Sequence, residues 1–276
     1  MPTHLDPSAL GTKAYWDSAY TLELANHASS ARDEGTIWFS DAAAEERILQ
    51  YLDDLASGGQ LMQNRGEGEG DDNNDDNDDD DDDEEEDAGD GGEAVKAAAL
   101  TTFLDLGTGN GHLLFALRDE GWEGVMMGVD YSGKSVALAR QIAAARQTEE
   151  KGLDVRFEEF DILAPLPASA PDWLGDGFDV VLDKGTFDAI SLSGETDARG
   201  RRICEGYRER VERLVKKGGR LVITSCNWTS EELKGWFGGG ELVYEDAIRY
   251  PSFTFGGQTG QQVCTLCFRR DGGGEP

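Results

Sequence analysis

Residues 104–111, LDLGTGNG, limit the possible folds of this chain more than any other stretch, because an apolar run leads directly into three alternating glycines. Gly107, Gly109 and Gly111 give the backbone a freedom that costs stability, so such a cluster marks a sharp turn or a close approach to a ligand. The residues before it are typical of a buried strand, and a helical pattern begins near His112. A glycine-rich turn between a strand and a helix is where ligands bind in open α/β sheets.

From residue 100 onward, segments typical of strands alternate with segments typical of helices. Strands are expected in TTFLDLG, GVMMGVDYS, DVRFEEFD, GFDVVLDKG, GGRLVITSCN, ELVYEDAIRY and QQVCTLCFRR, and helices at 112–120, 132–147, 199–216 and 229–237. This alternation predicts a parallel sheet with both faces covered. The last two strands should pair antiparallel, because PSFTFGGQTG between them is too short for a crossover helix. The expected fold is α/β, a doubly wound Rossmann-like sheet of about seven strands, mostly parallel with an antiparallel C-terminal strand.

The residues ahead of the sheet predict helices. In AYWDSAYTLEL, Trp16 and Tyr20 are four residues apart and therefore share one helical face. In SDAAAEERILQYLDDL, Ser40 or Asp41 can cap a helix. The apolar stripe of that helix comprises Ala44, Ile48, Tyr51, Leu52 and Leu55. Residues 1–58 are expected to form an N-terminal helical cap on a core that spans residues 97–270.

An acidic tract separates these two regions. Residues 67–93 contain 18 Asp or Glu, no Lys or Arg and almost no apolar residue. Such a segment cannot bury enough surface to offset the cost of ordering, so residues 59–96 are predicted to be a disordered surface insertion. A solvated spacer is the favoured interpretation, and recruitment of a basic partner is the alternative. Residues 271–276 are expected to be a flexible tail.

Composition excludes several classes of partner. Outside residues 67–93 the chain carries 38 acidic against 25 basic residues, so no basic surface for direct nucleic-acid binding is expected. No uncharged apolar segment approaches the roughly 18 residues needed to cross a bilayer, and the N-terminal residues lack a signal-peptide pattern. Four cysteines are typical of an intracellular protein with reduced thiols. No metal site is predicted, because the lone pair Cys264 and Cys267 lies in a strand pattern that points the side chains to opposite faces.

The glycine spacing distinguishes between cofactors. A dinucleotide fingerprint, G-x-G-x-x-G, would need glycine where the chain has His112, and no Gly-Lys-Ser/Thr of a P-loop follows. G-x-G-x-G preceded by Asp105 resembles motif I of the class I S-adenosylmethionine methyltransferases. Asp130 ends the second strand, 21 residues beyond Gly109, where a carboxylate can accept hydrogen bonds from both ribose hydroxyls of either cofactor. A helix cap or a strand-end turn is the structural alternative for each acid.

Five segments together resemble the elongation factor 1-alpha lysine methyltransferase family of the seven-strand methyltransferases. They are SALGTKAYWDSAYTLEL, LDLGTGNGHLL, GVDYS, DKGTFDAISLS and ITSCNWTSEEL, and the similarity covers residues 8–57 and 100–270. The resemblance implies a cytoplasmic enzyme that transfers methyl groups from S-adenosyl-L-methionine (SAM) to a lysine of translation elongation factor 1-alpha, with S-adenosyl-L-homocysteine (SAH) as product. A monomer is expected. The expected cofactor-binding residues are Trp16, Asp105, Gly107, Thr108, Gly109, Gly111, Asp130, Tyr131, Asp161, Ile162 and Asp183.

The acceptor site is expected at the carboxyl ends of the fourth and fifth strands. A lysine amine must be neutral to attack, and a desolvated, aromatic-lined slot would lower its pKa. Asp183 is expected to orient the amine or to contact the methionine end of SAM, and Phe187 to line the slot. Asn227 and Trp228 are expected to form the opposite wall. For each of these four residues, simple packing is the alternative.

Four aromatic residues ahead of the sheet, Trp16, Tyr20, Trp38 and Phe39, could cover the cofactor or pack a helix on the core. Lys184 is expected to pair with an acid. Two other functions stay open at this point. One is a class I methyltransferase that acts on another protein or on a small molecule. The other is a non-catalytic SAM-binding module that recruits a basic partner through the acidic insertion.

Overall fold

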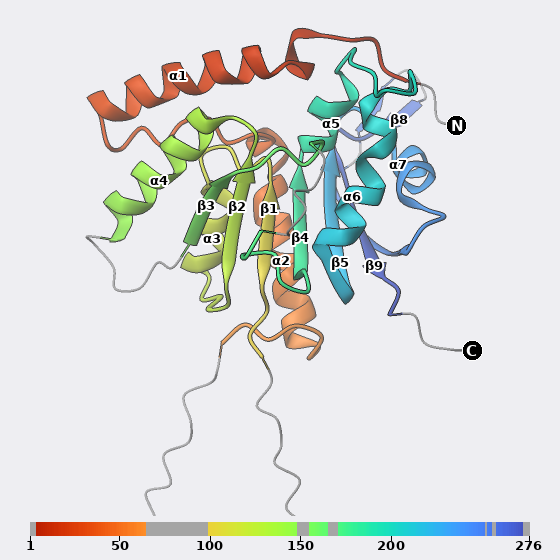
Figure 1. Cartoon of the computed structure of the whole chain (residues 1–276). Helices are drawn as coiled ribbons and strands as arrows, with labels where there is room; N and C mark the ends of the chain where they lie inside the picture. Colours follow the sequence, from red (N-terminus) through yellow and green to blue (C-terminus); the bar gives the residue numbers. More distant parts are fainter. Residues whose placement is uncertain are drawn as a thin grey trace, which may run out of the picture.

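A computed structural model describes residues 4–64, 99–147, 155–164, 171–251, 253–255 and 258–272. Most of the predicted insertion at 59–96 and of the predicted tail at 271–276 therefore lies outside the described residues. A seven-stranded sheet forms the centre of the molecule, and helices cover both of its faces (Figure 1). Among the described helices, none is both long and apolar enough to cross a bilayer.

The sheet has the strand order β3-β2-β1-β4-β5-β9-β6. Its strands are β1 (Phe103–Leu106), β2 (Met126–Asp130), β3 (Val155–Glu159), β4 (Phe178–Lys184), β5 (Val215–Ser225), β6 (Leu242–Ile248) and β9 (Cys264–Arg270). The first five run parallel, and β9 lies antiparallel between β5 and β6. The predicted Rossmann-like sheet and its antiparallel C-terminal strand are confirmed. A short hairpin of β7 (Phe253–Phe255) and β8 (Gln258–Gly260) occupies the connection in which no strand was predicted.

Seven α-helices accompany the described strands. They are α1 (Lys13–Ser29), α2 (Ala44–Ser57), α3 (His112–Asp119), α4 (Gly133–Gln147), α5 (Thr186–Ser191), α6 (Tyr207–Leu214) and α7 (Ser230–Phe237). The helix predicted at 199–216 is shorter than expected. The Asp197 carboxylate accepts hydrogen bonds from the backbone amides of Arg199 and Arg201, which fixes a turn where the helix was expected to begin.

The start of α2 also differs from the prediction. Ser40 and Asp41 lie in a short 3-10 turn, and neither caps the helix. Ala43 precedes α2 in a left-handed conformation with φ of 50°, and no side chain caps its first turn. Phe39, on the other side of the 3-10 turn, is left-handed as well, with φ of 64°. The chain therefore turns sharply at both residues before it enters the helix.

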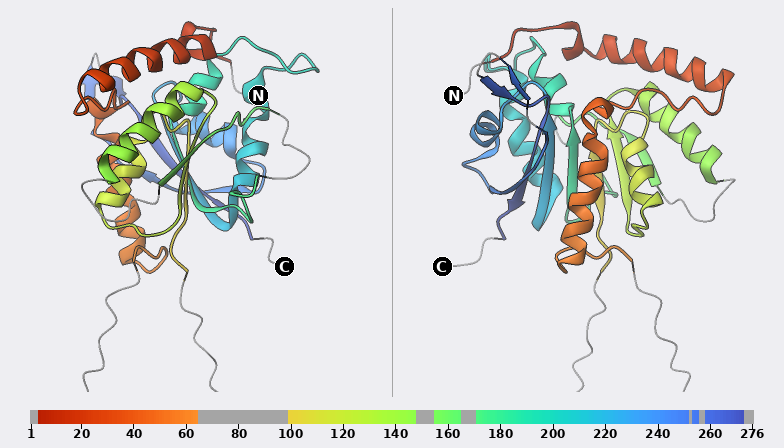
Figure 2. Two further views of the ribbon diagram at one scale, coloured as in Figure 1. Left: turned by 60° about the vertical axis from the view of Figure 1, so that its left-hand side comes forward. Right: turned by 180° about the vertical axis from the view of Figure 1, so that it is seen from behind.

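Alternating side chains of the strands feed two apolar cores, one on each face of the sheet. Phe103 packs on one face with Ile48 and Leu52 of α2 and with residues of α3 and α4. Leu104, its neighbour in β1, packs on the other face with Tyr207 of α6 and with residues of α7. Helix α1 lies outside both layers. It runs across the edge formed by the carboxyl ends of the strands and packs against α4 (Figure 2).

Candidate active site

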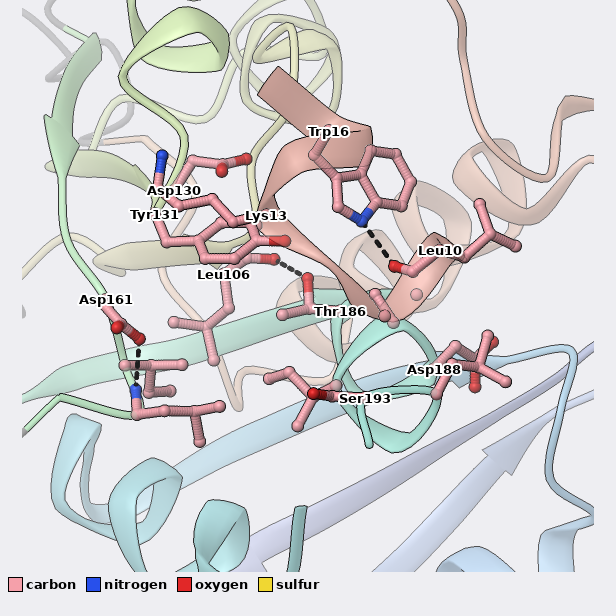
Figure 3. Close-up of a pocket in the computed structure, with 18 of the residues that line it drawn as sticks. Leu10, Lys13, Trp16, Leu106, Asp130, Tyr131, Asp161, Thr186, Asp188 and Ser193 are labelled. Carbon is pink, nitrogen blue, oxygen red and sulfur yellow. Dashed lines mark hydrogen bonds between the residues drawn. The ribbon is translucent and has the colours of Figure 1, made fainter. Parts of the chain in front are cut away.

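A cavity of about 470 Å³ lies where α1 and the residues around it cross the carboxyl ends of the parallel strands (Figure 3). Residues that follow β1, β2, β3, β4 and β5 all contribute to its wall, and residues 10–39 supply its cover. This is the position in which doubly wound sheets bind ligands, because the connections diverge there to opposite faces of the sheet.

The glycine-rich loop is held tightly between two side chains. Gly107 has φ of 62° and lines the cavity, and a Cβ added to it would lie 2.1 Å from Oγ1 of Thr186. Gly109 has φ of 59°, and a Cβ there would lie 2.8 Å from the hydroxyl of Tyr20. Close approach by α5 and α1 therefore explains these glycines. Gly109, Gly111 and Thr108 do not line the cavity, so their roles as cofactor ligands stay predictions.

Asp130 lines the cavity at the end of β2, although it is 5% exposed. Its carboxylate accepts hydrogen bonds from the amides of Gly109 (3.2 Å) and Ser132 (2.9 Å) and from the hydroxyl of Ser135 (2.8 Å). Burial raises the pKa of Asp130, and these hydrogen bonds oppose the rise. Since a carboxylate offers about four acceptor positions, about one remains for a ligand hydroxyl.

Residues after β3 form an apolar wall on the same side of the cavity. Ile162, Phe160 and Leu163 line it, and Asp161 stands among them. The Asp161 carboxylate accepts a hydrogen bond from the Leu163 amide at 2.8 Å, which fixes the turn. The combination of a buried acid at β2 and an apolar wall at β3 fits a nucleoside, whose ribose is polar and whose base is flat.

Trp16 and Tyr131 also line the cavity. Trp16 is fixed by a hydrogen bond of 2.7 Å from its Nε1 to the carbonyl of Leu10, and its ring lies 6.1 Å from the ring of Tyr20. Burial raises the pKa of Tyr131, so its hydroxyl keeps its proton. Asp105, in contrast, is buried in β1 and does not reach the cavity. Burial raises the pKa of Asp105 to about 7.

Of the four residues predicted to act on the acceptor, Asn227 alone lines the cavity. Asp183 is 1% exposed. Its carboxylate accepts hydrogen bonds from the amides of Thr186 (2.8 Å) and Phe187 (3.2 Å) and from the hydroxyl of Tyr207 (2.8 Å). Burial raises the pKa of Asp183 to about 7. This carboxylate therefore binds the start of α5 rather than facing the cavity.

Phe187 and Trp228 belong to an aromatic cluster in the core. The Phe187 ring lies 5.4 Å from that of Tyr207 and 6.2 Å from that of Trp228, and Trp228 donates a hydrogen bond to Ser191. Both residues are buried and neither lines the cavity. Their geometry favours the packing alternative, and direct roles for them stay predictions.

Asp188 is a cavity residue that the sequence did not single out. Its carboxylate accepts hydrogen bonds from the hydroxyl of Ser225 and from the amide of Cys226. Ser225 in turn accepts hydrogen bonds from the amides of Asn227 (3.1 Å) and Trp228 (3.0 Å). Asp188 thus fixes the turn that places Asn227 on the wall. In the sequence, Asp188 is the second acid of DKGTFDAI. Its place in the cavity wall can be predicted only once α5 is known to begin at Thr186.

Lys13 and Lys184 are the basic residues of the cavity wall. Lys13 forms an ion pair of 3.0 Å with Asp17 on α1. Lys184 was expected to pair with an acid. Among the described residues its amino group instead donates a hydrogen bond of 3.2 Å to the carbonyl of Trp38. This bond joins the end of β4 to the segment between α1 and α2.

A matching family model and three similar proteins are all named as methyltransferases. A family model described as a methyltransferase domain matches residues 98–267. The chain is 36% identical to protein-lysine N-methyltransferase EFM4 of Saccharomyces cerevisiae over 266 residues, which are 96% of each chain. It is 37% identical to efm4 of Schizosaccharomyces pombe, over 97% of this chain and 96% of that one. It is 30% identical to EEF1A lysine methyltransferase 2 of Homo sapiens, over 96% of this chain and 88% of that one.

Proposed function

We propose, since the chain belongs to the family of protein-lysine N-methyltransferases, that it methylates a lysine of translation elongation factor 1-alpha in the cytoplasm, with SAM as methyl donor. One observation carries the proposal. The similarity to the two yeast enzymes extends over at least 96% of this chain, so it includes both the sheet and the N-terminal segment that covers the cavity. The aligned region therefore includes both the strand ends and the cover of the cavity.

The cavity residues support SAM binding over β1, β2 and β3. Asp130 would accept a hydrogen bond from a ribose hydroxyl, and Ile162 and Phe160 would contact the adenine. Trp16 would cover the bound molecule from the side of α1. When bound, SAM supplies a methyl group that is activated by its positive sulfur.

The residues over β4 and β5 would receive the lysine. The lysine ammonium would first lose its proton to water, because only the neutral amine can attack. Its lone pair would then form a bond to the methyl carbon, while the bond from carbon to sulfur breaks and its electron pair stays on sulfur. The products would be a methylammonium group and SAH. Such a displacement needs alignment of the reactants and exclusion of water more than it needs a strong base. The carboxamide of Asn227, fixed by Asp188 and Ser225, is suited to orient the amine.

Labelling tests the proposal. The protein is incubated with tritiated SAM and a cell lysate, and then with purified elongation factor 1-alpha followed by peptide mapping. We expect one labelled band at the mass of elongation factor 1-alpha and a single modified lysine. Gly107→Arg is the matched control, because its side chain would enter the cavity and should abolish labelling. Label in another protein or in a solvent-extractable small molecule would assign the enzyme a different acceptor. SAM binding without any transfer would make the protein a binding module.

A further inference from the structure

The cavity has two ends that are built on different strands. The end over β2 and β3 holds Asp130 and Asp161, and the end over β4 and β5 holds Lys184, Asp188 and Asn227. Because β1 and β4 lie between β2 and β5 in the sheet, these two groups are at opposite ends of the cavity. Asp130 and the apolar wall after β3 suit a nucleoside, so the end over β4 and β5 is left for a different molecule.

A short segment between α1 and α2 forms the wall of the end over β4 and β5. Lys184 at the end of β4 donates its hydrogen bond to the carbonyl of Trp38. A Cβ added to Gly185 would lie 3.0 Å from the ring of Phe39, so this ring packs directly on the turn after β4. Both aromatic residues line the cavity. The Trp38 ring packs edge-on against Trp16, with centroids 5.4 Å apart.

The backbone of Phe39 is strained, and its conformation sets the direction of the Phe39 ring. Phe39 has φ of 64° and ψ of 22°, in the left-handed region that bulky residues avoid. Such a conformation is unfavourable for a residue with a side chain, and it persists where the surroundings impose it. Phe39 also packs beside Ala44 and Tyr250, which hold its position. Glycine would adopt this backbone without strain, yet the chain carries an aromatic side chain here.

Trp38 is more exposed than Phe39, because 40% of its surface is accessible to solvent although it lines the cavity. An indole at the mouth of a cavity offers an apolar face to whatever enters. Lysine matches such a wall. Its four-carbon stem packs on aromatic faces, and a desolvated amine favours the neutral form. The ammonium and its methylated forms are attracted to the face of an indole.

We infer that Trp38 and Phe39 are the aromatic wall of the acceptor-lysine slot, with Asn227 opposite. This inference rests on the proposed lysine methyltransferase function. It assigns the two residues to the acceptor rather than to the cover of the cofactor. It also predicts that Trp38 retains partly methylated lysine, and so influences how many methyl groups are added before release.

Trp38→Ala and Trp38→Phe are compared with Leu22→Ala, a control on α1 that is 63% exposed and is not part of the cavity wall. Initial rates are measured over a range of concentrations of purified elongation factor 1-alpha, and SAH affinity is measured by calorimetry. Trp38→Ala should raise the KM for the protein about 10-fold and shift the products to monomethyl-lysine, with SAH affinity nearly unchanged. Trp38→Phe should restore most of the loss, and Leu22→Ala should behave as wild type.

Two further measurements make the test independent of turnover and of folding. Binding of elongation factor 1-alpha to the SAH-loaded protein should weaken about 10-fold in Trp38→Ala. Phe39→Gly removes the ring and relieves the left-handed strain, so it should keep the melting temperature while raising the KM. A loss of SAH affinity at unchanged KM would assign Trp38 to the cofactor instead. If Trp38→Ala is active and its KM and products are unaltered, the assignment of Trp38 to the acceptor-lysine slot is wrong. If the wild-type protein is inactive, the proposed function itself is wrong.

Discussion

Asp183 illustrates at the scale of one residue how burial sets the properties of a carboxyl group. Its oxygens accept hydrogen bonds from three donors, Thr186, Phe187 and Tyr207, and its side chain is almost inaccessible. The pKa of Asp183 is raised to about 7 by burial, whereas an aspartate in an unfolded chain has a pKa near 3.9. The folded protein therefore binds a proton that the unfolded chain releases.

The first prediction follows from this linkage. The stability that the Asp183 proton contributes is complete below about pH 4 and is lost as pH rises through about 7. Asp183→Asn keeps the shape of the side chain and is neutral at every pH. The melting temperature of Asp183→Asn, relative to that of wild type, should therefore rise as the pH increases from 4.5 to 8. Thermal melting across this range measures the difference, and a difference that does not change with pH would contradict the prediction.

Asp183→Ala separates charge from hydrogen bonding. It removes the acceptor of all three donors and leaves the buried hydroxyl of Tyr207 without its partner. Relative to Asp183→Asn, which also lacks the titrating group, we expect a loss on the order of 3 kcal/mol in the free energy of unfolding at every pH. If Asp183 contacted the lysine instead, Asp183→Asn would lower turnover strongly at unchanged stability.

The second prediction concerns Asp130 and the cofactor. Asp130→Ala should lose on the order of 1.5–3 kcal/mol of SAM affinity, the range for hydrogen bonds to charged groups. Ser135→Ala is the matched control, because it removes one protein contact of the same carboxylate and leaves the charge in place. Calorimetric titration of both variants distinguishes a direct contact from a loop effect. Equal losses in the two variants would show that Asp130 acts by holding the loop.

Some of the predicted site residues line the cavity and others do not, for a physical reason. Asp130 ends the parallel strand β2, and Asp161, Ile162 and Asn227 come shortly after β3 and β5. The carboxyl ends of such strands meet at one edge of the sheet. The same rule suggested Asp183. There the turn at Gly185, with φ of 92°, starts α5 at once and directs its first amides back to the carboxylate. The position of Asp183 near the end of a strand does not reveal that the next backbone amides donate hydrogen bonds to its carboxylate.

At the scale of elements, hydrophobic alternation predicted the strands of the main sheet well. The short elements were missed because they carry too little pattern. Helix α5 has six residues, less than two turns, and β7 and β8 have three residues each. The segment of Trp38 and Phe39 was predicted only as aromatic residues ahead of the sheet. Its contact with the end of β4 joins residues 146 positions apart, which local pattern does not encode.

The third prediction concerns the connection between α5 and the end of β5. Ser225 donates to Asp188 and accepts from the amides of Asn227 and Trp228. Ser225→Ala should release the turn that carries Asn227 and lower kcat about 10-fold, with SAM affinity nearly unchanged, because a misplaced group disturbs alignment more than binding. Steady-state kinetics and calorimetry on the same preparation measure the two effects.

Thr229→Ala is the matched control for that variant. Thr229 and Glu232 form the capping box of α7, and removing the cap should cost about 1 kcal/mol of stability. It leaves the contacts of Asn227 in place. If both variants lost kcat in proportion to their loss of melting temperature, the role of Ser225 would be stability alone.

At the scale of the whole molecule, the acidic tract joins two points that the fold already holds together. Met62 and Thr101 stand on either side of it, and each donates a hydrogen bond to the other, at 2.8 and 2.9 Å. The tract at 66–93 lies outside the described residues. Since Met62 and Thr101 are already joined in the folded domain, we expect the length and sequence of the segment between them to carry little consequence for folding.

The last prediction concerns this tract and is made from its charge. Deletion of residues 66–93 should leave the melting temperature and the SAM affinity nearly unchanged. The deletion removes 18 of the 56 acidic residues, so it should slow methylation of a basic protein at low salt. A second variant that replaces those acids with Asn and Gln keeps the length and separates charge from chain entropy. Both variants should lose several-fold in kcat/KM at about 0.01 M salt, where charges act over about 30 Å, and match wild type near 1 M, where they act over about 3 Å. A large fall in melting temperature on deletion would show that the tract packs on the domain, and a salt-independent loss of rate would show that it contacts the substrate by something other than charge.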